Sequence, residues 1–411
     1  MKKHRENVEM RFSTSTKPLK EEQLLQLADF SKGKDYSKKD IKLEGHPIIL
    51  YGRLYTKYQV NIADVDTLTE PKDGSIYSQG GEVIIPSSGE SAEDIIRASV
   101  IENDNIIIGG DLNIIKPKEL IDSTFLALSI SNGKMYEELV RKAQGKSVVH
   151  IRNSDLEETY LIYPPLEEQI LIGDFFKNLD SLLANHNTQL KKLTNLKKAM
   201  LIKMFPQDGA SVPEIRFNGF DGEWEKCILS DVTEYHNGKG YESEQSMSGK
   251  YELINLNSIS IDGGLKPSGK FINNAELTLN KDDLVMILSD VGHGDLLGRV
   301  AIIPENNKYV LNQRVALLRP ELEVLPLFLY YTINVNQIYF KMQGAGMSQL
   351  NISKSSVEDF EFLYPTNREE QIKVSNYFKN FDNLINNHKE QLKKLNQIKK
   401  ACLSKLFVSQ E

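Results

Sequence analysis

Residues 185–200 read NHNTQLKKLTNLKKAM, and residues 387–402 read NHKEQLKKLNQIKKAC. When residues 175–205 are aligned with residues 377–407, at a shift of 202 positions, 18 of the 31 positions are identical. Two generic helices would not agree to this extent by coincidence. The chain therefore contains one element twice, and this repeat has to be recognised first because it determines how the rest is organised.

The repeated element has the pattern of a long amphipathic helix. In the first copy, two stripes of residues recur every seven positions and form an a/d-like seam, made by Leu179, His186, Leu193 and Met200 and by Leu183, Leu190, Lys197 and Met204. Pro164-Pro165 suits a helix start, and Glu167-Glu168 suits the positive end of the helix dipole. Phe205-Pro206 ends the first copy.

This helix needs a partner of equal length. From Leu166 to Phe205 it has 40 residues, or about 60 Å at ~1.5 Å per residue, which is too long to bury its seam on a small domain. The other copy is the obvious partner, and an approximate internal two-fold makes the two helices antiparallel. We therefore predict an antiparallel coiled coil in which His186 and His388 approach each other at the crossing. The alternative is two helices that each pack on their own domain.

The stretches before the two helices, residues 20–165 and 213–365, share a plan. Each has a Leu-x-Asp start, a polar glycine–lysine segment, two aliphatic strands and a helix. The expected elements are Pro47–Tyr51, Asn105–Ile108 and 120–131 in the first stretch, and Tyr251–Asn255, Asp283–Ile287 and 325–334 in the second. The expected fold class is α+β, with two similar mixed α/β domains joined by the helix pair around an internal pseudo-two-fold. The expected boundaries are 1–165 and 207–365 for the domains, and 166–206 and 366–411 for the helices.

Composition and charge limit the function classes. No apolar run approaches the length of a membrane span, the N-terminus does not look like a secretory signal, and the only two cysteines are far apart, so we expect a cytoplasmic protein. The net charge is −7, yet residues 175–205 and 377–407 each carry +5. The remainder therefore carries −17, and we expect the chain alone to hold DNA poorly. The lysines of the basic helices are interpreted equally well as an ordinary solvent-exposed face that has no role in binding.

Catalytic signatures are missing from the sequence. The seven histidines show no metal-ligand spacing, and we find no nucleophile–histidine arrangement, phosphate-binding loop or nuclease carboxylate cluster. We therefore expect no catalytic residues, no metal site and no cofactor in this chain.

The combination of features resembles the specificity subunit of type I restriction–modification systems. The carrying motifs are the two variable α+β domains, the Tyr-Pro that precedes Glu-Glu-Gln-Ile at the start of each spacer helix, the stretch Pro213–Trp224 and the segment Gly346-Met-Ser-Gln-Leu350. The resemblance covers nearly the whole chain. It implies a DNA-binding, non-catalytic specificity subunit whose two target-recognition domains each read one half of a split double-stranded DNA target.

The resemblance also implies partners. The helices would dock two methyltransferase subunits, which use S-adenosylmethionine, and restriction subunits, which use ATP and Mg²⁺, would join to cleave foreign DNA. Base reading needs polar and aromatic groups on loops. The candidates are Lys32, Lys34, Tyr36, Arg53, Tyr55 and Lys57 in the first domain, and Asn237, Lys239, Tyr241, Asn257, His293, Arg299, Arg314 and Gln349 in the second.

Two other functions remain open at this point. A self-contained DNA methyltransferase or nuclease would need a cofactor loop and a catalytic signature. A coiled-coil scaffold with two adaptor domains would bind no DNA, and a comparison of DNA methylation with and without the gene would distinguish it.

Overall fold

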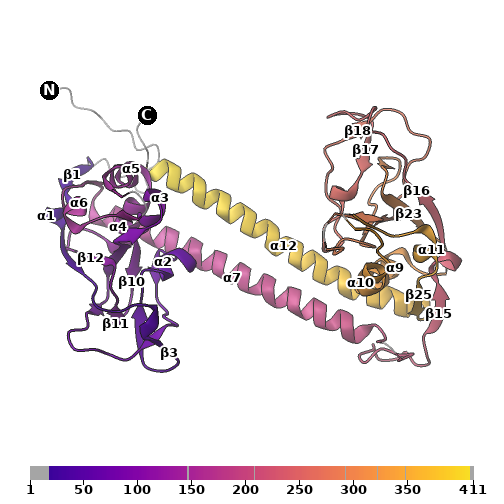
Figure 1. The fold of residues 1–411 in the computed structure, drawn as a ribbon, viewed down its shortest axis with the longest axis horizontal. Helices are drawn as coiled ribbons and strands as arrows, with labels where there is room; N and C mark the ends of the chain where they lie inside the picture. The colour runs from indigo at the N-terminus through magenta and orange to yellow at the C-terminus, as the bar shows by residue number, and fades with distance from the viewer. Residues whose placement is uncertain are drawn as a thin grey trace. The chain divides into compact units, whose positions relative to one another are not determined.

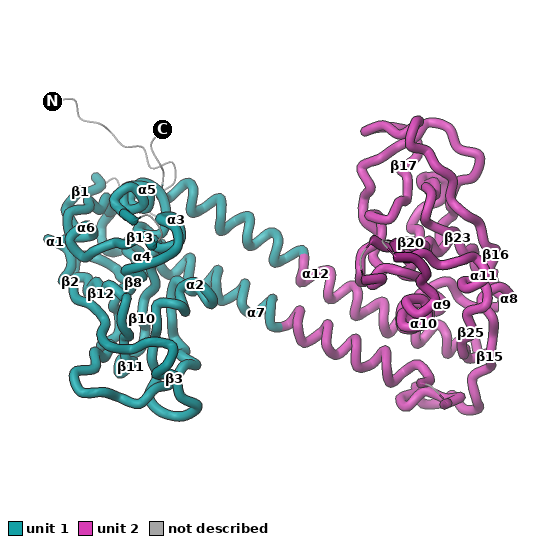
Figure 2. Tube along the Cα trace, viewed as in Figure 1, with its two compact units in different colours: residues 1–188, 390–411 teal, residues 189–389 magenta. Residues whose placement is uncertain are grey.

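The computed structural model describes residues 18–145, 148–207, 209–291, 293–321, 323–347 and 349–407. The chain divides into two compact units, residues 1–188 with 390–411 and residues 189–389 (Figure 2). Each unit holds one globular lobe and part of each of two long helices, α7 (Leu166–Met204) and α12 (Arg368–Leu406). Within the described ranges, no helix is both long and apolar enough to cross a bilayer.

The first lobe is built on two five-stranded sheets (Figure 1). The first sheet has the order β2-β12-β8-β10-β5, with bounds Ala28–Lys32, Leu112–Pro117, Glu82–Pro86, Ser99–Ile101 and Asn61–Ile62. The second has the order β3-β6-β4-β11-β7, with bounds Ile41–Lys42, Leu68–Thr69, His46–Ile49, Asp104–Ile108 and Tyr77–Gln79. Two antiparallel pairs complete the lobe, β1–β14 (Lys20–Gln23 with Tyr160–Tyr163) and β9–β13 (Ser88–Gly89 with Val149–His150).

The helices of the first lobe are short. They are α1 (Leu24–Leu27), α2 (Arg53–Thr56), α3 (Ala92–Ile95), α4 (Ser123–Ser131), α5 (Gly133–Lys142), α6 (Asn153–Glu157) and the 3₁₀ turn η1 (Lys38–Asp40). Helix α4 is mostly apolar, and its residues 125–130 are buried in the core. It begins after Asp122, whose carboxylate caps it by accepting the Phe125 N–H at 2.8 Å, so the helix starts slightly later than the expected residue 120.

The described residues of the second lobe form four sheets. A four-stranded sheet has the order β16-β23-β19-β21, with bounds Thr233–Asn237, Val315–Pro320, Leu284–Ile287 and Val300–Ile302. A three-stranded sheet has the order β18-β17-β22, with bounds Phe271–Ile272, Tyr251–Ile254 and Tyr309–Leu311. The two pairs are β15–β25 (Glu225–Ile228 with Glu361–Tyr364) and β20–β24 (Ser289–Asp290 with Leu350–Asn351). The helical elements are α8 (Leu229–Val232), η2 (Leu256–Ser258), α9 (Pro326–Val335), α10 (Gln337–Met342) and α11 (Lys354–Glu358).

The two lobes have the same core topology. The order β2-β12-β8-β10 in the first corresponds to β16-β23-β19-β21 in the second. Equivalent strands also form a parallel pair in each lobe, β4 with β11 and β17 with β22, and the first lobe has a further parallel pair, β5 with β10. The prediction of two α+β domains on one plan is therefore confirmed, and each expected strand and helix named above is present within a few residues.

A buried glutamine joins each long helix to its own lobe. Gln169 donates to the carbonyl oxygens of Pro164 and Leu120 at 2.9 and 3.1 Å and accepts the Asp122 N–H at 3.0 Å. Gln371 makes the same three bonds in the second lobe. Both side chains are fully buried, so each amide satisfies backbone groups that water cannot reach. This explains why Glu-Glu-Gln-Ile recurs at both helix starts.

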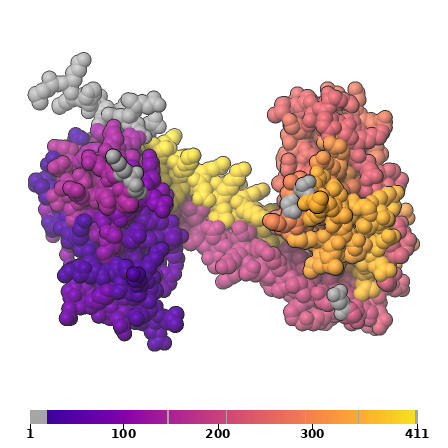
Figure 3. Space-filling view, viewed as in Figure 1, coloured from indigo at the N-terminus to yellow at the C-terminus, as the bar shows by residue number. Residues whose placement is uncertain are grey.

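Within each unit the two long helices run antiparallel. In the first unit, Phe407 follows the end of α12 and packs on Phe176 near the start of α7, with ring centres 6.5 Å apart. In the second unit, Phe205 follows the end of α7 and packs on Phe378 near the start of α12, at 6.0 Å. In Figure 3 the yellow end of α12 lies beside the violet first lobe, and Leu403 and Leu406 pack with the core of that lobe. The antiparallel pairing predicted from the repeat is thus present in both units.

The expected approach of His186 to His388 stays a prediction. His186 belongs to the first unit and His388 to the second. The expected domain 1–165 begins with residues 1–17, which lie outside the described ranges.

Candidate nucleic-acid interface

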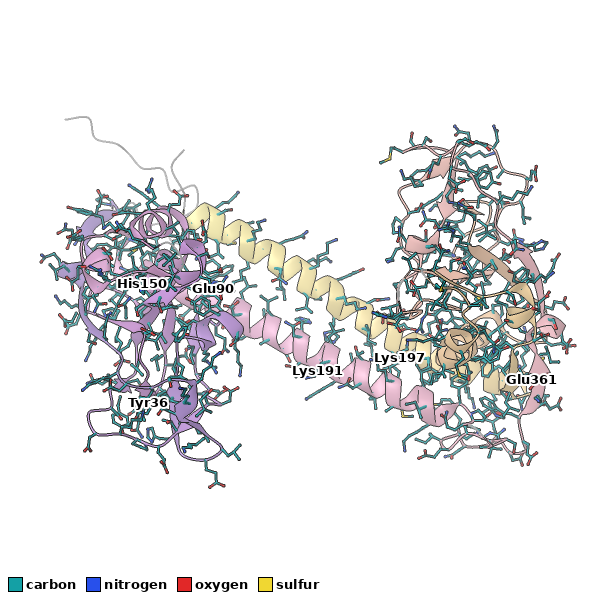
Figure 4. The ribbon with its side chains drawn as sticks, viewed as in Figure 1. Tyr36, Glu90, His150, Lys191, Lys197 and Glu361 are labelled. Atoms are coloured by element: carbon teal, nitrogen blue, oxygen red, sulfur yellow. The ribbon has the colours of Figure 1, made fainter. Side chains whose placement is uncertain are left out.

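Four short segments of the first lobe meet at one surface, here called loop surface 1: residues 31–34, 87–90, 109–111 and 148–150. The Gly33 N–H bonds the Leu112 carbonyl at 2.9 Å, and the Ser87 N–H bonds the Asp111 carbonyl at 2.7 Å. The β9–β13 pair joins His150 to Ser88. Figure 4 shows His150 and Glu90 near each other on this lobe. The exposed charged and imidazole side chains of loop surface 1 are Lys32, Lys34, Glu90, Asp111 and His150.

The second lobe repeats the arrangement in loop surface 2: residues 236–239, 288–291, 312–314 and 349–351, with residues 292 and 348 outside the described ranges. The Gly238 N–H bonds the Val315 carbonyl at 3.0 Å, and the Leu288 N–H bonds the Arg314 carbonyl at 2.9 Å. The β20–β24 pair joins Ser289 to Asn351. Its exposed polar side chains include Asn237, Lys239, Arg314 and Asn351.

A glycine in each lobe allows two of these segments to touch. A Cβ at Gly33 would lie 1.9 Å from the Gly109 carbonyl oxygen, and a Cβ at Gly238 would lie 1.9 Å from the Asn312 carbonyl oxygen. Any side chain here would collide with backbone, which cannot move aside without separating the segments. The glycine in each Gly-Lys segment is therefore required by close packing, and it places Lys34 and Lys239 at equivalent points of the two surfaces.

The structure brings some of the predicted readers together. Lys32 and Lys34 lie on loop surface 1, and Asn237, Lys239, Arg314 and Gln349 lie on loop surface 2. Tyr55 borders the first surface, because its hydroxyl donates to the Ser88 carbonyl oxygen at 3.0 Å. Tyr241 borders the second, because its N–H bonds the Asn312 side chain at 3.3 Å.

Other predicted readers are held inside the fold. Arg53 is buried and donates to Asp66 Oδ1 at 2.8 Å and to the Asp64 carbonyl oxygen at 2.8 Å. Lys57, which is exposed, shares Asp66 with it at 2.7 Å. Tyr36 is buried and its hydroxyl lies 2.5 Å from Ser75 Oγ. These contacts give Arg53 and Tyr36 a part in holding the loops together.

Three predicted residues of the second lobe lie away from the centre of loop surface 2 or at its edge. Asn257 is exposed in the η2 turn. His293 is exposed beside the β20 end of the surface. Arg299 is half-buried and donates to the Asn334 carbonyl oxygen at 3.2 Å, and burial lowers the pKa of its guanidinium. Arg299 is therefore part of the contact between β21 and α9.

Sequence reasoning missed Asp111, His150 and Asn351. His150 and Asn351 directly precede Ile151 and Ile352, which align when the two halves of the chain are compared, so the repeat carried a signal for them. Asp111 was missed because candidate DNA-binding residues were chosen by chemical type. Its counterpart Arg314 is basic and met that criterion, whereas an acidic residue did not.

The charges of the helices are partly neutralised within each unit. Lys399 bonds Asp180 at 2.5 Å in the first unit, and Lys197, labelled in Figure 4, bonds Asp382 at 2.5 Å in the second. Other helix lysines remain exposed, namely Lys191, Lys192, Lys198, Lys393, Lys394 and Lys400. They occupy equivalent positions in the two copies of the repeat, so both helices present the same basic face.

Comparison with known proteins agrees with this architecture. The family model described as "Type I restriction modification DNA specificity domain" matches twice, at residues 17–195 and 221–397. The chain is similar to the "Type I restriction enzyme MjaVIII specificity subunit" of Methanocaldococcus jannaschii, with 20% identity over 90% of this chain and 87% of that protein. It is also similar to the "Putative type I restriction enzyme MjaX specificity subunit" of the same organism, with 22% identity over 79% of this chain and 77% of that protein.

A solved structure supports the fold. The S subunit of a type I restriction–modification system from M. genitalium superposes with a TM-score of 0.68 at 17% identity, covering 98% of this chain and 99% of the other. The two family matches together span well over half of the chain. The chain therefore belongs to the type I restriction–modification DNA specificity family, and it is a non-catalytic specificity subunit with two recognition domains.

Proposed function

We propose that this chain reads a split double-stranded DNA target, one half with each lobe, through loop surfaces 1 and 2. The observation that carries the proposal is the matched construction of the two surfaces. Both use the same strands, the same glycine contact and the same backbone bonds, yet their exposed side chains differ: Asp111 and His150 in one lobe stand where Arg314 and Asn351 stand in the other. Two surfaces that share a backbone arrangement but carry different side chains are suited to reading two different base sequences.

The helix pair acts as a ruler and as a docking surface. Two readers on one face of a duplex have to be held about one helical turn apart, roughly 34 Å, and a rigid pair of helices can set such a distance where a flexible linker cannot. Two methyltransferase subunits dock on the basic faces of α7 and α12 and methylate adenine with S-adenosylmethionine. Restriction subunits join them and use ATP and Mg²⁺ to cleave unmodified DNA, all in the cytoplasm.

The direct test is the DNA methylation pattern of cells. The chain is produced together with the methyltransferase subunit of its own host in a strain without other DNA methylation, and the genome is read by single-molecule sequencing. We expect one adenine-methylated, two-part motif that disappears when this chain is omitted. Methylation that does not depend on this chain, or none in its presence, would contradict the proposal.

The purified chain separates this function from a self-contained enzyme. Incubated alone with duplex DNA and labelled S-adenosylmethionine, the chain should transfer no label, and addition of the methyltransferase subunit should restore transfer. Label transfer by the chain alone would favour the self-contained methyltransferase instead. Failure of the chain to bind the methyltransferase subunit, or failure of their complex to bind DNA, would favour a scaffold.

A further inference from the structure

A left-handed residue lies at the same point of each lobe. Asp111 has φ 60° and precedes β12, and Arg314 has φ 67° and precedes β23. Each offers its carbonyl oxygen to the edge of the neighbouring hairpin, Asp111 to the Ser87 N–H and Arg314 to the Leu288 N–H. The two residues are therefore structural equivalents, although one carries a negative charge and the other a positive charge.

Arg314 is unusual for its backbone conformation. The described part of the chain has six non-glycine residues with positive φ, and the other five are aspartate or asparagine: Asp35, Asn105, Asp111, Asp282 and Asn307. Aspartate and asparagine tolerate this region because their short side chains bond the local backbone, whereas arginine gains nothing from it. Glycine would suit the turn better. Strain of this kind points to a use for the side chain outside the fold.

The charged side chains of Arg314 and Asp111 are both available to a partner outside the fold. Arg314 is exposed, and none of the hydrogen bonds or ion pairs of the described residues involves its guanidinium. Asp111 is exposed, and its carboxylate has a single long contact, 3.5 Å to the Ser87 hydroxyl. By contrast, Arg319 nearby in the sequence bonds Asp283 with two nitrogens, at 2.9 and 2.8 Å. The fold therefore fixes the backbone of Asp111 and Arg314 and leaves their charged groups available.

We propose that Asp111 and Arg314 are matched base-reading residues whose opposite charges make the two halves of the target differ at one base pair. The inference rests on the proposed function and deepens it. A guanidinium only donates hydrogen bonds and suits the O6 and N7 acceptors of guanine. An ionised carboxylate only accepts, and suits the N4 amino group of cytosine. The half-site of the second lobe then requires a guanine, and that of the first lobe requires a cytosine, at equivalent positions.

The test uses the methylation motif of cells that produce the methyltransferase subunit with each variant. Arg314→Gly keeps the left-handed turn and should not lower the unfolding temperature. It should remove the requirement for one guanine in the half-site of the second lobe and leave the other half unchanged. The wild-type preference at that base, expected to be roughly ten- to a hundredfold from one bidentate contact, should fall to near one.

Asp111→Asn tests the other half. Asparagine also tolerates the left-handed turn and pairs with adenine rather than cytosine, so the motif of the first lobe should change from cytosine towards adenine at one position. The matched control is Asp282→Gly, an exposed left-handed residue of the second lobe outside loop surface 2, which should leave the motif unchanged.

Three results would overturn the assignment. Unchanged motifs in both variants would show that neither residue reads a base. A uniform loss of methylation with the motif intact would show a phosphate contact, while the proposed function would survive. A lower unfolding temperature for Arg314→Gly would show that the arginine supports the fold. Absence of any two-part motif with the wild-type chain would instead count against the proposed function itself.

Discussion

Among the described residues of the second lobe, Arg216 and Glu370 form the most buried ion pair. The Arg216 guanidinium donates to both carboxylate oxygens at 2.7 and 2.8 Å, and the Trp224 indole N–H donates to Oε1 at 3.3 Å. The hydrogen bonds that Arg216 donates to Glu370 raise the pKa of its guanidinium above the ordinary value. This cluster ties the segment that follows α7 to the first turn of α12, so it helps to define where the second lobe begins.

Replacement of Glu370 should destabilise the second lobe strongly. Glu370→Gln leaves the Arg216 charge without its counter-charge in a site where the glutamate is 1% exposed, and breaking such a pair costs about 3–5 kcal/mol. Urea unfolding followed by the fluorescence of Trp224, the single tryptophan, measures the loss. Glu361→Gln is the control, since its pair with Lys226 is exposed and is worth less than ~1 kcal/mol. Equal losses in the two variants would contradict the assignment.

Buried tyrosines should make the fold sensitive to alkali. Burial raises the pKa of Tyr163, in the first lobe, and of Tyr235, in the second, from 10.0 to about 12. The native state therefore holds these protons more tightly than the unfolded state, so the stabilisation is complete below pH 10 and is lost as the pH rises towards 12. Unfolding temperatures measured from pH 9 to 12 should fall through this window. Tyr163→Phe should flatten the fall, and an identical slope would count against the role of this tyrosine.

The sequence located candidate residues by type but not by environment. Lys34 and Lys239, which follow the glycine of each glycine–lysine segment, are exposed, and their part in base reading stays a prediction. Arg53 and Tyr36 have equally suitable chemistry, yet they are buried by partners 13 and 39 positions away, Asp66 and Ser75. Contacts at such separations depend on topology, which no local pattern contains.

At the scale of the elements, an ion pair joins α7 to α12 in each unit, at equivalent positions of the repeat. Lys399 bonds Asp180 in the first unit, and Lys197 bonds Asp382 in the second. In the second unit the Tyr331 hydroxyl also donates to Asp382 at 2.7 Å, and the Lys197 ammonium lies 5.5 Å from the centre of the Tyr331 ring. A shifted helix register would leave these half-buried charges unpaired, so the pairs help to specify the register.

A double-mutant cycle should reveal this coupling. Asp382→Ala removes the acceptor of both Lys197 and the buried Tyr331 hydroxyl, and should cost about 2–3 kcal/mol. Lys197→Ala alone should cost less, and the pair should show a coupling of about 1–2 kcal/mol. Urea unfolding of the second lobe measures each value. Additive losses would show that the two side chains act independently and do not specify the register.

The heptad pattern predicted the helices and their antiparallel pairing, because a seam of 39-residue helices needs a partner of equal length. It could not predict the ion pairs. Asp180 and Asp382 align in the repeat, as do Lys197 and Lys399, but each aspartate pairs with the lysine of the other copy. Only the register shows this exchange, and the register depends on the aromatic contacts at the helix ends.

At the scale of the whole molecule, the compact units do not follow the order of the chain. Each long helix begins on its own lobe and ends in the core of the other unit, where Phe407 joins the first core and Phe205 the second. Sequence comparison of the halves revealed the duplication, because related sequences fold alike. The predicted antiparallel pairing placed the end of each helix beside the start of the other, but it did not reveal that Phe407 and Phe205 join the cores, which follows from packing. The end of α12 therefore completes the core of the first unit, and the end of α7 completes the core of the second.

The charge distribution should make the isolated chain a weak DNA binder. The net charge is −7, and five helix lysines are paired internally, namely Lys177, Lys197, Lys203, Lys389 and Lys399. Since phosphate neutralisation supplies most non-specific affinity, we expect dissociation constants of about 10⁻⁶ M or weaker at physiological salt. Fluorescence anisotropy with a labelled duplex measures this value for the chain alone and for its complex with the methyltransferase subunit.

The complex should bind far more tightly than the chain, because the partner adds phosphate contacts that the acidic lobes cannot supply. Its affinity should therefore fall more steeply with salt, at a slope of about −0.9 per additional phosphate contacted. Lys191→Gln is an informative variant, since this exposed lysine of α7 (Figure 4) projects from the basic helix face. If the face docks the partner, the variant weakens complex formation and leaves the salt slope of the formed complex unchanged. If the face contacts DNA directly, the slope decreases by about one. Nanomolar binding by the chain alone would show that loop surfaces 1 and 2 hold DNA without help, contrary to the charge argument.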